Sequence, residues 1–151
     1  MDGVEVLVVQ EVGKWYQGTL SGNAYFNQID AFSVENLYPV PNLFYADRQQ
    51  TFSWNAKFNQ RLRFSHGWDG QLVASYYAPD IIPQGKTGGR FSLDIGLQKS
   101  IQQGKGQLSA NGTDILNTLV ARKTVVGQGF TYTSADYLET QVIRVGYSYK
   151  F

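Results

Sequence analysis

The amino-acid sequence predicts an all-β fold, an antiparallel up-and-down meander of about seven or eight strands. Three observations lead to this prediction. Apolar and polar side chains alternate along most of the chain. The connections between these segments are alternately tight and long. The 151 residues include ten Tyr, nine Phe, three Trp and sixteen Gly. A period of two residues is that of a strand whose two faces meet different environments. Abundant aromatic residues and glycine are typical of β architecture with tight turns.

The predicted strands are seven segments, at 3–11, 15–28, 51–64, 71–78, 90–101, 106–116 and 140–151, and most of them alternate. The first is apolar on both faces, which suits a strand packed against something internal to the molecule. The second alternates cleanly over more than ten residues. The third, TFSWNAKFNQRLRF, is the best defined. At ~3.3 Å per residue and a tilt near ~40°, it rises about 35 Å, enough to cross the ~25 Å apolar band of a membrane.

One face of the third strand carries Lys57, Arg61 and Arg63. Three cationic side chains would strongly destabilise the core of a sandwich, but they are ordinary in a water-filled lumen or on a soluble surface. With Asp94 of the strand 90–101, they are the candidate lumen-facing polar residues. They could pair with a domain inside a barrel or line a permeation path. Simple solvation by lumen water and cross-strand pairing is the alternative interpretation.

The connections between the strands alternate in length. Tight ones are predicted around 12–14, 65–70 and 102–105, and longer ones around 29–50, 79–89 and 117–139. The connection 29–50 contains Pro39 and Pro41 and no sustained period, so it is predicted to be a long loop. The connection 117–139 is expected to project as a long, partly β-structured hairpin.

The last strand, 140–151, has one wholly apolar face and ends on an aromatic residue. The spacing Arg144-x-Gly146-x-x-Tyr149-x-Phe151 resembles the C-terminal signal of bacterial outer-membrane β-barrels. In that family the segment is the closing strand, and the barrel assembly machinery reads it in the periplasm. An amphipathic final strand of a soluble sandwich is the alternative interpretation of the same alternation.

The membrane interpretation explains how the connections are sorted. No hydrophobic run approaches the ~18 residues needed for a spanning helix, so a membrane-embedded chain must be a barrel. Outer-membrane barrels have short periplasmic turns and longer extracellular loops. If Phe151 lies in the periplasm, every tight turn lies there too. Bacterial single-chain barrels have even strand numbers, so the odd count and the lack of a signal peptide after Met1 predict further strands upstream.

Four segments together resemble the C-terminal part of TonB-dependent receptors, especially the outer-membrane β-barrel family common in Bacteroidetes. They are TFSWNAKFNQRLRF, YYAPDIIPQGKTGGRFSLDIGLQKSI, LSANGTDILNT and RVGYSYKF. The resemblance implies that residues 1–151 are a single all-β segment of a larger transmembrane β-barrel in the bacterial outer membrane, without its plug domain and upstream strands. It also implies uptake of a ligand too large for porins. The implied partners are outer-membrane lipid, the barrel assembly machinery, the plug domain and the TonB complex, and the connections 29–50 and 117–139 would help to form the outer ligand vestibule.

The composition argues against several other functions. A net charge of +1 gives no electrostatic attraction to nucleic acid, and the absence of Cys with a single His disfavours disulfide, thiolate and metal chemistry. Ser65, His66 and Asp69 share one tight turn and cannot adopt the geometry of a catalytic triad. We therefore expect no enzyme and no cofactor.

One alternative function stays open from the sequence, a soluble β-barrel or sandwich binding module with an apolar interior. The sequence also leaves open the transported ligand, the number of strands in the whole barrel, the oligomeric state, and whether an isolated piece would close, dimerise or rearrange through its unpaired edges.

Overall fold

The computed structural model describes residues 2–38, 41–127, 129–138 and 140–151. Its strands are β1 (Asp2–Val12), β2 (Tyr16–Ile29), β3 (Phe32–Asn36), β4 (Asn42–Ala46), β5 (Gln49–Arg63), β6 (Trp68–Tyr77), β7 (Asp80–Ile82), β8 (Gly85–Thr87), β9 (Arg90–Ile101), β10 (Gly106–Thr113), β11 (Val120–Gly127), β12 (Phe130–Tyr137) and β13 (Val142–Tyr149). Short 3₁₀ turns, η1 (Ser65–Gly67) and η2 (Gln102–Gly104), join β5 to β6 and β9 to β10.

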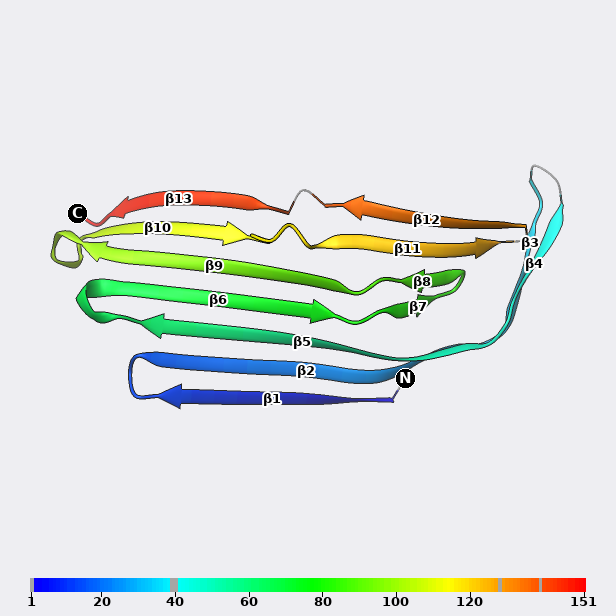
Figure 1. The fold of residues 1–151 in the computed structure, drawn as a ribbon, viewed down its shortest axis with the longest axis horizontal. Coiled ribbons are helices and arrows are strands. Elements are labelled where there is room, and N and C mark those ends of the chain that lie inside the picture. The colour runs from blue at the N-terminus through cyan, green and yellow to red at the C-terminus, as the bar shows by residue number, and fades with distance from the viewer. Residues whose placement is uncertain (1, 39–40, 128, 139) are drawn as a thin grey trace.

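The main sheet has seven antiparallel strands in the order β1-β2-β5-β6-β9-β10-β13 (Figure 1). The four-stranded sheet β12-β11-β8-β7 continues the order of β13, β10, β9 and β6, so it prolongs four of the seven strands beyond the main sheet. The tight turns all lie at one end of the molecule and the prolonged hairpins at the other (Figure 1). The predicted all-β up-and-down meander is confirmed.

The long connections are more regular than predicted. The connection 29–50, expected to be a loop, contains the hairpin β3–β4, in which Phe32 pairs with Ala46 and Val34 with Phe44. Each of these strands has only five residues, too few for alternation to be recognised. Pro39 lies outside the described residues. The connection 79–89 also forms a hairpin, β7–β8, whereas β11–β12 in 117–139 agrees with the prediction.

Some predicted strand ends were wrong. The strand β10 ends at Thr113 rather than at 116, because Asp114 has a φ of 44° in the left-handed region, which is incompatible with an extended strand. The strand β6 begins at Trp68, within the predicted turn 65–70.

The register places apolar side chains on one face of the main sheet and polar side chains on the other. Leu20, Phe58, Ala74 and Leu93 are cross-strand neighbours on the apolar face, and the next row of the polar face contains Ser21, Lys57, Ser75 and Ser92. This agrees with the parity that the sequence predicted.

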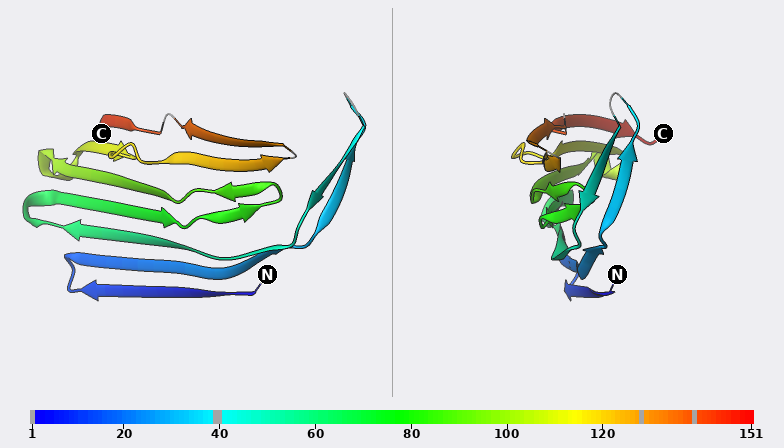
Figure 2. Two further views of the ribbon diagram at one scale, coloured as in Figure 1. Left: turned by 45° about the vertical axis from the view of Figure 1, so that its right-hand side comes forward. Right: turned by 90° about the vertical axis from the view of Figure 1, so that its right-hand side faces the viewer.

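The apolar face is exposed. Trp54 is 42% exposed and Tyr147 is 55% exposed. The buried hydrophobic residues in the described part of the chain are Ala46, Ile81 and Val120, and they belong to the long connections rather than to the main sheet. The main sheet is a single curved layer (Figure 2). The alternative of a soluble module with an apolar interior is therefore contradicted, because Trp54 and Tyr147 do not converge on a sealed core.

Candidate lumen-facing site

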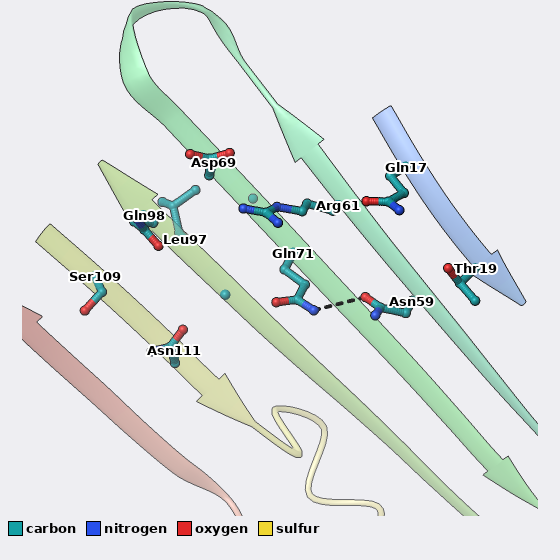
Figure 3. Close-up of a pocket in the computed structure, with 12 residues that line it drawn as sticks. Gln17, Thr19, Asn59, Arg61, Asp69, Gln71, Leu97, Gln98, Ser109 and Asn111 are labelled. Atoms are coloured by element: carbon teal, nitrogen blue, oxygen red, sulfur yellow. Dashed lines mark hydrogen bonds between the residues drawn. The ribbon is translucent and has the colours of Figure 1, made fainter. Parts of the chain in front are cut away.

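The polar face of the main sheet forms one continuous hydrophilic surface. One cross-strand row runs through all seven strands and contains Glu11, Gln17, Arg61, Gln71, Gly96, Asn111 and Arg144. Around this row the sheet encloses a concavity of about 430 Å³, lined by side chains of five strands (Figure 3). Within it, Gln71 Nε2 donates a hydrogen bond to Asn59 Oδ1 at 3.0 Å. Amide and hydroxyl groups dominate this surface, so it suits contact with water or with another polar protein surface.

The four predicted lumen-facing residues all lie on this polar face, but they do not form one cluster. Arg61 lines the concavity. Arg63 approaches Asp69, with 3.8 Å between Nε and Oδ1, and because the Arg63 side chain is 57% exposed the pair stabilises the fold only slightly. Lys57 lies one row further from the turns than Asn59, between Ser21 and Ser75. Asp94 has a structural task, because its Oδ1 accepts a hydrogen bond from the Asp114 N–H at 2.8 Å.

The residues of the predicted assembly signal are divided between the two faces of β13. Arg144 and Gly146 lie on the polar face, opposite Asn111 and Ser109. A Cβ at Gly146 would lie 2.9 Å from Ser109 Oγ, so glycine permits this close approach. Tyr149 lies on the apolar face, and its ring makes an edge-on contact with Phe151 at 5.3 Å between centroids. Recognition of these residues by the assembly machinery stays a prediction.

At the hairpin end, β7 is fixed across the polar face. The Asp80 carboxylate accepts hydrogen bonds from Tyr25 Oη at 2.9 Å and from Asn27 Nδ2 at 3.0 Å. Ser53 Oγ donates to the Pro79 carbonyl at 3.1 Å. Because Tyr25 and Asn27 belong to the polar face of β2, the start of β7 passes over β5 to reach them. These contacts, called the Asp80 clamp below, were not predicted from the sequence.

Replacing Asp80 by alanine is expected to release β7 and β8 from the polar face. The change removes the acceptor of two side-chain hydrogen bonds, which together contribute about 1–3 kcal/mol. We expect hydrogen exchange of the β7 and β8 amides to accelerate about tenfold or more, while that of β1 and β2 stays unchanged. The matched control is Asp47→Ala, since Asp47 is exposed. Equal exchange in the two variants would contradict the clamp.

A larger groove lies beyond the clamp, between the β4–β5 junction, the β7–β8 hairpin and β11. Its volume is about 950 Å³, and its lining includes Tyr45, Arg48, Lys86 and Val126. Arg48 is held by Gln28, with 2.7 Å between Nη2 and Oε1, and by Asp30, with 3.7 Å between Nε and Oδ1. The end-on view shows the β3–β4 hairpin at the open side of the curved sheet (Figure 2). The predicted vestibule segments 29–50 and 117–139 thus line one groove together with 79–89.

The junction between the main sheet and the prolonged strands is held by Asp114. This residue has no exposed surface. Its carboxylate accepts hydrogen bonds from Thr118 N at 3.1 Å, Leu119 N at 3.2 Å and Thr140 Oγ1 at 2.7 Å. Asp114 therefore connects the break between β10 and β11 with the break between β12 and β13, just beyond the end of the main sheet.

The hydrogen bonds to Asp114 determine its protonation. Burial raises the pKa of the carboxyl group, but the bonds from Thr140, Thr118 and Leu119 favour the charged form, and the net pKa is lowered. The sequence places Asp114 in the predicted strand 106–116 and in the resembling segment LSANGTDILNT, but it does not predict the structural role of this residue.

A single antiparallel layer with an exposed apolar face and a concave polar face is the wall of a transmembrane β-barrel. The model of the outer membrane protein beta-barrel family matches residues 3–149, and the chain belongs to this family. The protein is accordingly located in the bacterial outer membrane. No curated protein and no solved structure matches the chain significantly. None of the helical turns in the described ranges has the length and apolar character needed to span a bilayer.

Proposed function

We propose that this chain is part of the barrel wall of a TonB-dependent receptor, of the type common in Bacteroidetes, that takes up a ligand too large for porins. The observation that carries the proposal is the groove of about 950 Å³ at the hairpin end, which adjoins the polar face of the sheet. Family membership supports it, because the matched range 3–149 contains three of the four segments that resemble such receptors and most of the fourth, RVGYSYKF. The groove is large enough for a bulky ligand.

The polar face would contact a plug domain in the lumen. Lys57 and Arg61 make no ion pair with the described residues, so their charges are available for carboxylates of a plug or for lumen water. The cross-strand row from Glu11 to Arg144 would then be the surface that contacts the plug, in the part of the barrel nearer the tight turns.

The two edges of the main sheet need further strands in this proposal. Within the described residues no strand pairs with the outer edge of β1 or of β13. Backbone N–H and C=O groups cannot remain unpaired in the hydrocarbon region of a bilayer. Additional strands of the same barrel, between β13 and β1, would satisfy them.

Growth of a deletion strain tests the uptake function. The strain is grown with a ferric siderophore as sole iron source, or with an oligosaccharide or an oligopeptide as sole carbon source. We expect a growth defect on one of these, restored by the wild-type gene and reproduced by deletion of the energising complex. Normal growth on all three, or restored growth without the energising complex, would argue against a TonB-dependent receptor.

The groove itself is tested by a tyrosine that lines it. Tyr45 is 66% exposed within the groove, whereas Tyr38, 89% exposed, does not line it. We expect Tyr45→Ala to raise the KM of uptake about fivefold, as the loss of one aromatic contact predicts. Tyr38→Ala is the matched control and should leave KM unchanged. Equal KM values for the two variants would show that the ligand binds elsewhere.

A further inference from the structure

Lys99 lies on the apolar face of the sheet. The register places it between Trp68 of β6 and Leu108 of β10, and Leu108 in turn faces Tyr147 of β13. A charged side chain on the lipid face of a barrel is destabilising at the bilayer centre and tolerated near the interface. Lys99 is three residues from the turn η2, so its long side chain can reach the level of the headgroups.

The side chain of Lys99 is directed towards a tight turn. Its Nζ donates a hydrogen bond to the His66 carbonyl of η1 at 2.7 Å, and it lies 4.8 Å from the centroid of the Trp68 ring. The ammonium group has three N–H donors, and the carbonyl uses one. No carboxylate among the described residues pairs with Lys99. Its positive charge is therefore stabilised by a carbonyl and an aromatic face but is not neutralised.

The same end of the molecule has an excess of positive charge. At this end, six residues are Lys or Arg and two are Asp or Glu. The count covers the three tight turns with four residues on either side of each, and the end of β13. At the opposite end, four residues are Lys or Arg and seven are Asp or Glu, counted over the connections 30–48, 78–89 and 114–141. The turn end is thus the cationic end, which suits an anionic lipid surface.

Aromatic residues mark the depth of this end in the membrane. Phe64, Trp68 and Tyr149 are 54%, 39% and 41% exposed and surround the turns on the apolar face. Trp and Tyr side chains gather at membrane interfaces because they combine an apolar ring with a polar N–H or O–H group. With short turns in the periplasm, Lys99 lies at the headgroup level of the periplasmic leaflet.

We infer that Lys99 and Trp68 form a binding site for the phosphate of an anionic phospholipid in the periplasmic leaflet. The free N–H donors of Lys99 bind the phosphate, the Trp68 ring packs against the glycerol and upper acyl region, and the carbonyl of His66 fixes the ammonium group. The bound lipid holds the barrel at a defined depth. This inference rests on the membrane location and the orientation of the turns, and it is independent of any transported ligand.

Photo-crosslinking in bilayers tests the site. The full-length protein is reconstituted with equal amounts of photoreactive phosphatidylglycerol and phosphatidylcholine, and the adducts on peptides containing Trp68 or residues 99–108 are quantified. We expect about fivefold more phosphatidylglycerol adduct in the wild type, the size of effect that one charge has at an anionic surface, and equal adducts in Lys99→Gln. Lys57→Gln, on the opposite face, is the matched control and should behave as wild type. Equal adducts in the wild type would overturn the inference.

Two further measurements keep the inference testable if Lys99→Gln does not fold. In the wild type, 1 M NaCl should bring the adduct ratio close to one, because the Debye length falls to about 3 Å. Inorganic phosphate should compete no better than chloride at equal ionic strength. A ratio that is independent of salt, or specific competition by free phosphate, would overturn the assignment to a lipid.

Discussion

Replacing Ala74 by arginine is expected to destabilise the folded protein in a bilayer by about 2–4 kcal/mol, the cost of a guanidinium group on the lipid face near the membrane midplane. Ala74 is in the middle of β6, between Phe58 of β5 and Leu93 of β9 on the apolar face. The arginine would have no carboxylate neighbour and no short route to the headgroups. Denaturant titration of the full-length protein refolded into lipid vesicles would measure the loss.

The adjacent residue is a sharp control for this prediction. Val73 lies on the polar face, between Asn59 and Asp94. In Val73→Arg the new charge would meet water and a carboxylate, so we expect a change within about 0.5 kcal/mol. A loss of stability that is larger for Val73→Arg than for Ala74→Arg would mean that lipid contacts the polar face, and the assignment of the two faces would be wrong.

The long strands could be predicted because their environments repeat every two residues over many residues. In β5 the alternation runs from Phe52 to Arg63, and in β9 both predicted ends, at 90 and 101, agree with the structure. Each residue of such a strand contributes to the same pattern, so the face of every side chain follows from the sequence. The alternation of tight and long connections followed from the same segments.

Short and irregular elements could not be predicted in this way. Gly67, Trp68, Asp69 and Gly70 have the composition of a turn, yet Trp68 already belongs to β6, because it pairs with Lys99 of β9. The predicted strand end at 116 was wrong because Asp114 turns the backbone into the left-handed region, and the alternation of apolar and polar residues also stops at Asp114 and Ile115.

The contacts that form the candidate site depend on residues far apart in the chain. Tyr25 and Asp80 are separated by 55 positions, and neither is unusual in its own segment. Asp94 and Asp114, which share a hydrogen bond across β9 and β10, carry no local signal of their contact. The sequence could therefore predict that Asp94 lies on the polar face, but it could not predict that Asp94 supports the end of β10.

Replacing Asp114 by alanine is expected to open the junction between the main sheet and the prolonged hairpins. The change leaves the Thr118 and Leu119 amides without their acceptor, which destabilises the junction by about 2–4 kcal/mol. Alanine is also disfavoured at a φ of 44°. Asp114→Asn keeps a residue that tolerates this conformation and one acceptor oxygen, so its loss should be about half as large. Hydrogen exchange of the two amides would measure both, and Asp136→Asn, an exposed acid in β12, is the control.

The pH dependence of amide protection at the junction distinguishes the contribution of the Asp114 charge from that of its backbone conformation. Because its folded-state pKa is lowered, the carboxylate contributes its full stabilisation above the unfolded-state pKa of about 3.9, and this contribution is lost as the pH falls through the folded-state value. In the wild type, protection of the Thr118 and Leu119 amides, corrected for intrinsic exchange, should fall below about pH 4. In Asp114→Asn the same protection should be lower at neutral pH and independent of pH in that range. Protection that falls equally in both proteins would show that another group controls the junction.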